Sequence, residues 1–118
     1  MERYEDRLES SSYANDEVVG AGPSGRADYD GWVWIPERLF SRMQHLAKAY
    51  EFHVLTRLDP YGRNSLNVEQ VESLLDEVEF IGRVVEDEAL RVQLERLRAV
   101  AVAVRGAGPR TELVIEGP

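Results

Sequence analysis

The 118-residue chain contains no cysteine, which excludes disulfide bonds, thiolate metal sites and cysteine nucleophiles. It also lacks any run near the ~18 apolar residues that a membrane-spanning helix needs. Its opening segment, MERYEDRLESSS, has no apolar stretch of the kind found in a secretory signal. We therefore expect a cytoplasmic protein.

Positively charged residues are also fewer than negatively charged ones. The chain has 14 Lys and Arg against 22 Asp and Glu, for a net charge of −8. Nucleic-acid backbones and anionic membranes bind clusters of Lys and Arg, so we expect neither as a partner. An acidic balance instead favours a basic protein partner, although it also serves plain solubility.

The length and a hydrophobic content of 43% fit one globular domain. Residues 1–28 combine many charges with the Gly-rich run 20–25 and few apolar residues. This composition predicts a flexible acidic and Gly-rich arm at residues 1–28, followed by a single small globular domain at residues 29–118.

Two segments favour strands. Tyr29–Ile35 (YDGWVWI) is aromatic and β-branched, and Glu112–Ile115 is apolar after an acidic residue. Because a lone strand needs a neighbour, we expect these two to pair. The predicted fold class is mostly α (α+β), with a three-helix core, a minimal two-stranded element and the flexible N-terminal arm.

The first predicted helix opens at Pro36, a favoured first-turn residue, and should end between Tyr50 and Arg57. Phe52–Leu58 also alternates as a strand would, but no Gly or Pro interrupts it, so we favour continued helix. The apolar stripe of this helix comprises Leu39, Phe40, Met43, Leu46, Ala47, Tyr50 and Val54.

A turn and a helix start occupy the middle of the chain. The residues DPYG at 59–62 predict a tight turn, and Asn67 with Gln70 three positions later predicts a capping box. The helix that follows should end near Gly82. Its inward positions are Val68, Val71, Leu74, Leu75 and Val78, and its outward acidic positions are Glu69, Glu72, Asp76, Glu77 and Glu79.

Acidic residues 86–88 open a third helix. Residues Ala99–Val104 of this helix are apolar nearly all round, which predicts either deep burial or a surface for self-association. Its inward stripe comprises Leu90, Leu94, Leu97, Ala101 and Val104.

Three motifs could carry chemistry, but the residues in or around each of them do not support it. VVGAGPSG at 18–25 is similar to a dinucleotide-binding fingerprint, but SSSYANDE before it and RADYDGW after it do not read as the required strand and helix. Residues 59–70 fit a calcium-loop frame in length, yet Tyr61 and Arg63 stand where oxygen ligands belong. His45 and His53 lie too far apart on a helix to share a metal. We therefore expect no metal, no cofactor and no enzymatic activity, and keep a small hydrolase or cofactor binder using His45 or the Gly-rich arm as a further alternative.

The run LDPYGRNSLNVEQVESLLDEVEF resembles a recurring segment of small bacterial proteins associated with immunity to secreted toxins, in which a DPYG…N…Q block links two helices. The resemblance covers about a fifth of the chain and implies a structural signature without catalytic residues. It also implies an immunity or antitoxin type of function.

Together these features predict a non-enzymatic protein-binding module that neutralises a basic partner through an acidic helix face. A self-associating adaptor or accessory subunit, including a possible homodimer, is the alternative. The expected partner-binding residues are Glu69, Glu72, Asp76, Glu77 and Glu79, with Tyr61 and Trp32 as aromatic anchors.

Overall fold

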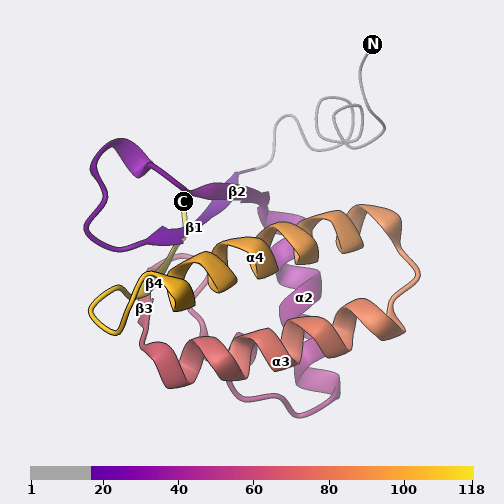
Figure 1. The fold of residues 1–118 in the computed structure, drawn as a ribbon. Coiled ribbons are helices and arrows are strands. Elements are labelled where there is room, and N and C mark those ends of the chain that lie inside the picture. Colours follow the sequence, from indigo (N-terminus) through magenta and orange to yellow (C-terminus); the bar gives the residue numbers. More distant parts are fainter. Residues whose placement is uncertain (1–16) are drawn as a thin grey trace.

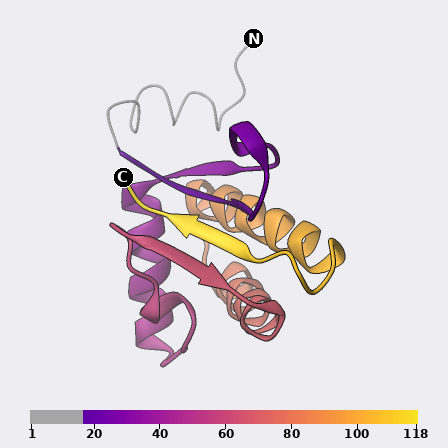
Figure 2. The same cartoon turned by 90° about the vertical axis from the view of Figure 1, so that its left-hand side faces the viewer.

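The computed structural model of the chain describes residues 17–118, apart from the side chain of Ala27 (Figure 1). It is an α+β fold of two layers. Four strands form one antiparallel sheet in the order β2-β1-β4-β3, and Figure 2 shows the three helices behind it. The strands are β1 (Val18–Pro23), β2 (Val33–Pro36), β3 (Arg63–Leu66) and β4 (Leu113–Glu116).

The prediction of a two-stranded element is wrong, because β1 separates the two strands that were expected to pair. Val19 of β1 pairs with Ile35 of β2, and Ala21 pairs with Ile115 of β4. Val19 and Ala21 are fully buried. The part of the predicted arm at residues 18–23 is therefore a central strand, whereas residues 1–16 of that arm lie outside the described residues.

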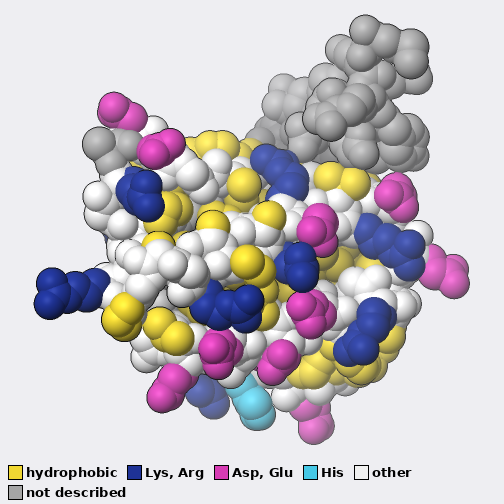
Figure 3. Space-filling model, viewed as in Figure 1, with side chains coloured by type: hydrophobic (Ala, Val, Ile, Leu, Met, Phe, Trp, Pro, Cys, Tyr) yellow, Lys and Arg dark blue, Asp and Glu magenta, His cyan; other side chains and the backbone are white. Residues whose placement is uncertain are grey.

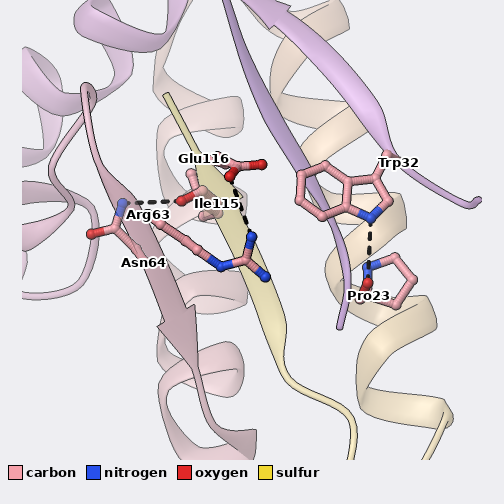
Figure 4. Close-up of polar contacts among 6 residues, drawn as sticks. All are labelled: Pro23, Trp32, Arg63, Asn64, Ile115 and Glu116. Atoms are coloured by element: carbon pink, nitrogen blue, oxygen red, sulfur yellow. Dashed lines mark hydrogen bonds and ion pairs between the residues drawn. The ribbon is translucent and has the colours of Figure 1, made fainter. Parts of the chain in front are cut away.

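The two glycines of β1 are typical of a flexible linker, but in this strand they have a packing role. A Cβ at Gly22 would lie 2.2 Å from Cγ of Trp32, and one at Gly20 would lie 2.5 Å from Cζ3 of Trp34. Both indole rings therefore lie directly on the β1 backbone, which only glycine permits. The Trp32 Nε1 also donates to the Pro23 carbonyl at 3.3 Å (Figure 4).

Three helices cover the inner face of the sheet: α2 (Glu37–Ala49), α3 (Val68–Val84) and α4 (Glu88–Gly106). The predicted inward stripe of α4 is confirmed at all five positions, and Val71, Leu74, Leu75 and Val78 of α3 are buried as predicted. Leu39, Phe40, Met43 and Ala47 of α2 are buried as well, but Tyr50 is exposed. Among the described residues, no helix has the length and apolar character that crossing a membrane requires.

The prediction that the first helix continues beyond Tyr50 is wrong. The Glu51 backbone takes a left-handed conformation with φ of 59°, the Glu51 N–H donates to Lys48 O at 3.1 Å, and the Phe52 N–H donates to Ala47 O at 2.8 Å. This arrangement is a Schellman ending, which usually carries glycine at the left-handed position. Only a 3₁₀ turn, η2 (Leu55–Arg57), follows it.

The turn and the capping box of the central segment are confirmed. The Asp59 carboxylate accepts from the Tyr61 N–H at 2.9 Å, and Asn64 Nδ2 donates to the Asp59 carbonyl at 2.9 Å. Asn64 Nδ2 also donates to the Ile115 carbonyl at 3.1 Å (Figure 4). Asn67 accepts from the Gln70 N–H, and the Gln70 side chain accepts from the Asn67 N–H, both at 2.9 Å. The turn is thereby fixed to β4, and α3 begins where predicted.

Asp87 joins two helices, because it caps the start of α4 and forms an ion pair with Arg42 of α2. The hydrogen bond from Arg42 lowers the pKa of Asp87 below its ordinary value of 3.8. Ionised Asp87 therefore stabilises the fold above the unfolded-state pKa, and this contribution is lost as the pH falls through the folded-state pKa.

We expect Asp87→Asn to lower the free energy of unfolding by about 0.5–1 kcal/mol at neutral pH, because asparagine still caps the helix but has no charge. Urea unfolding at neutral pH and at successively lower pH measures this; the difference from the wild type should shrink as the pH falls through the lowered pKa of Asp87. Arg42→Gln should show the same pH dependence. A difference that stays constant across this range contradicts the assignment.

Candidate functional site

The outward side of α3 carries a row of exposed carboxylates, from Glu69, Glu72, Asp76 and Glu79. Their spacings of three and four place them opposite the buried apolar stripe. At one end of the row, Arg98 of α4 approaches Glu79, with Nε to Oε1 at 3.4 Å and both side chains about half exposed. An exposed pair of this kind is weak, so the row keeps its negative character. We call these four residues the acidic face.

Glu77 does not belong to this face, and the prediction that places it there is wrong. Its side chain is only 7% exposed. One carboxylate oxygen accepts from the N–H groups of His53 and Val54 at 3.2 and 2.9 Å, and the other accepts from the Leu55 N–H at 2.9 Å. Glu77 therefore ties the loop after α2 to α3. Its spacing of three from Leu74 already put it on the inward side.

This loop brings three aromatic rings together beside the acidic face. Tyr50 and Phe52 lie with ring centroids 5.9 Å apart, and Phe80 of α3 lies 4.9 Å from Tyr50 and 5.4 Å from Phe52. Next to them is an open hollow of about 410 Å³, which we call the aromatic–acidic pocket. It is lined by Phe52, Ser73, Asp76, Glu77, Glu79, Phe80 and Arg83.

Charge in this pocket comes from both signs. Asp76 and Glu79 belong to the acidic face, and Glu77 closes the pocket from inside. The Arg83 guanidinium carbon lies 6.0 Å from the centroid of the Phe80 ring, which is the outer range of a cation–π contact. The pocket therefore offers aromatic and carboxylate surface together, in a form that the sequence did not indicate.

The two predicted aromatic anchors lie elsewhere. Tyr61 is 64% exposed and sits beside Glu37 at the start of α2; a hydrogen bond to the Glu37 carboxylate raises the pKa of the Tyr61 hydroxyl. Trp32 lies on the outer face of the sheet with Tyr29 and Trp34, at ring-centroid distances of 4.9 and 5.8 Å. β2 and β3 are opposite edges of the sheet, and α3 follows β3, so Trp32 and the acidic face do not form one surface.

A second hollow, of about 990 Å³, runs between α3 and α4. Figure 3 shows blue and magenta side chains alternating around yellow ones on this side of the molecule. Its walls include Arg91 and Arg98 as well as Glu88 and Glu95. Since positive and negative groups alternate, this groove has no dominant charge.

The apolar stretch Ala99–Val104 is largely part of the core. Val100, Ala101 and Val104 are buried, and Val102 is partly buried against the core, whereas Ala99 and Ala103 face solvent. Of the two predictions for this stretch, deep burial and a surface for self-association, the structure therefore supports deep burial.

The histidines are both exposed, His45 on α2 and His53 on the loop after it. Within residues 17–118, no three side chains of His, Cys, Asp or Glu come together as a metal site would require. No known protein-family model matches the chain, and neither curated proteins nor solved structures include a significant match to it.

Proposed function

We propose that this protein is a non-enzymatic binding module of the immunity or antitoxin type, and that its acidic face binds a basic surface of another protein. The observation that carries this proposal is the row of exposed carboxylates at Glu69, Glu72, Asp76 and Glu79. The row runs along one rigid helix whose start is fixed by a reciprocal capping box. Complementary charge of this kind steers a partner and sets the orientation in which it docks.

An exposed aromatic cluster lies next to the acidic face and also supports the proposed binding function. Interfaces draw most of their affinity from a few aromatic and arginine anchors, with charged groups around them setting rate and specificity. Tyr50, just after α2, is 45% exposed, and Phe80, near the end of α3, is partly exposed. The acidic face and the cluster together provide both kinds of contact.

The matched variants that test this proposal are Glu69→Gln/Glu72→Gln on the acidic face and Glu86→Gln/Glu112→Gln, which lie outside α3. All four residues are exposed, and both pairs change the net charge equally. Each protein is immobilised and exposed to an extract of the native host at increasing salt. We expect the wild type and the control pair to retain a basic protein, and the acidic-face pair to retain it about ten-fold less well at low salt.

Raising the salt concentration should release the retained protein, because exposed charges more than about 10 Å apart are screened at 0.1 M salt. Equal retention by the two double variants, or retention independent of salt, contradicts a role for the acidic face.

A further inference from the structure

We propose that the aromatic–acidic pocket is the anchor site for one arginine side chain of the partner. This inference rests on the proposed function in one respect, namely that the partner is a basic protein. The aromatic rings and carboxylates of the pocket, and the hydrogen bonds that hold it, do not depend on that function. It would turn a diffuse electrostatic attraction into a contact with a defined position.

The chemistry of the lining selects a planar cation. Phe52 and Phe80 meet nearly at right angles, with an interplanar angle of 88°, and both rings line the pocket. A guanidinium stacks on an aromatic face while its N–H groups donate to carboxylates. Asp76 and Glu79 supply those carboxylates from the same pocket.

Arg83 already places a guanidinium at the edge of cation–π range of this ring, since its guanidinium carbon lies 6.0 Å from the Phe80 ring centroid. Arg83 is exposed and follows Glu79 by one helical turn. We infer that it partly occupies the place of the incoming arginine and competes with it.

Other occupants fit the lining less well. An anionic group would face the carboxylates of Asp76, Glu77 and Glu79 against a single guanidinium. A purely apolar group would take water from the exposed carboxylates of Asp76 and Glu79 without giving them a hydrogen-bond donor, which is costly. An arginine satisfies both parts of the pocket.

The pocket is also held in place before a partner arrives. The Phe52 N–H is fixed to Ala47 O at 2.8 Å, and Glu77 binds the three N–H groups that follow Phe52 in the chain. A site organised in this way loses less freedom when it binds.

The test uses small probes, so that it needs no knowledge of the partner. The ¹⁵N-labelled protein is titrated with Nα-acetyl-arginine amide and, in parallel, with Nα-acetyl-citrulline amide, which has nearly the same shape but no charge. We expect the arginine probe to shift the amide resonances of residues 52 and 76–83, with an affinity about five-fold higher than that of the citrulline probe.

Substitutions inside and outside the pocket test whether the arginine probe binds there. Asp76→Asn and Phe80→Leu should each weaken arginine binding by about three-fold or more, and Arg83→Gln should strengthen it by removing the competing cation. Asp76 is exposed, so Asp76→Asn remains informative even if Phe80→Leu fails to fold. Glu69→Gln/Glu72→Gln, which lies outside the pocket, should change the affinity by less than about two-fold.

Equal shifts from the two probes, or an unchanged response in Asp76→Asn, would overturn the arginine site. Those outcomes leave the acidic face untouched, because its own test rests on Glu69 and Glu72. Conversely, arginine binding with no effect of Glu69→Gln/Glu72→Gln on partner retention would keep the pocket and remove the proposed function.

Discussion

Glu77→Ala is expected to lower the free energy of unfolding by about 3–5 kcal/mol, because it leaves one buried and two partly buried N–H groups without their acceptor. The Glu77 carboxylate accepts all three N–H groups of His53, Val54 and Leu55, and the contact to Leu55 is fully buried. Urea unfolding followed by tryptophan fluorescence or circular dichroism measures the change.

Two neighbouring variants show whether this cost comes from burial or from charge. Glu72→Ala, on the exposed side of the same helix, should cost no more than about 0.5 kcal/mol. Glu77→Gln keeps one acceptor oxygen and should fall between the two. A loss below about 1 kcal/mol for Glu77→Ala would mean that the loop after α2 does not depend on this carboxylate.

Gly22→Ala is expected to cost about 2–3 kcal/mol, although alanine normally suits a strand at least as well as glycine. Its Cβ would lie 2.2 Å from the Trp32 ring, so the indole must leave the β1 backbone and give up its hydrogen bond to Pro23. The loss is read from chemical unfolding, as for Glu77.

A double-mutant cycle assigns this cost to the indole. In a Trp32→Ala background, Gly22→Ala should change the free energy of unfolding by less than about 0.5 kcal/mol, because the obstructing ring is gone. Equal costs in the two backgrounds would show that the glycine is needed for its backbone and not for the ring.

The helices were the predictable part of this fold, because their signals are local. Asn67 and Gln70 mark the start of α3 through a pattern of residue types three positions apart, and the inward stripe of α4 follows from its periodicity. Each of these features depends on residues within a few positions of one another, so a single sequence contains the information.

β1 could not be found in the same way. Its sequence, VVGAGP, has the composition of a linker, and its two glycines make sense only once Trp32 and Trp34 are folded over them. The end of α2 could not be predicted either, because Glu51 takes the left-handed conformation at a position where helices usually carry glycine.

The candidate site, too, could be predicted only where its signals are local. The exposed carboxylates of α3 could be read from helical spacing, and so could the burial of Glu77, which lies three positions after Leu74. The aromatic–acidic pocket could not, because it joins Phe52 to Phe80 across 28 positions of the chain and depends on a loop held by a buried carboxylate.

The most direct measurement is a map of where a basic ligand binds. The ¹⁵N-labelled protein is titrated with a short peptide of alternating arginine and serine, and amide shifts are recorded across residues 17–118. We expect the largest shifts along α3 between Glu69 and Asp76 and around Phe52 and Phe80. Shifts spread evenly over the surface, or gathered at Tyr29, Trp32 and Trp34 on the outer face of the sheet, would contradict binding through the acidic face.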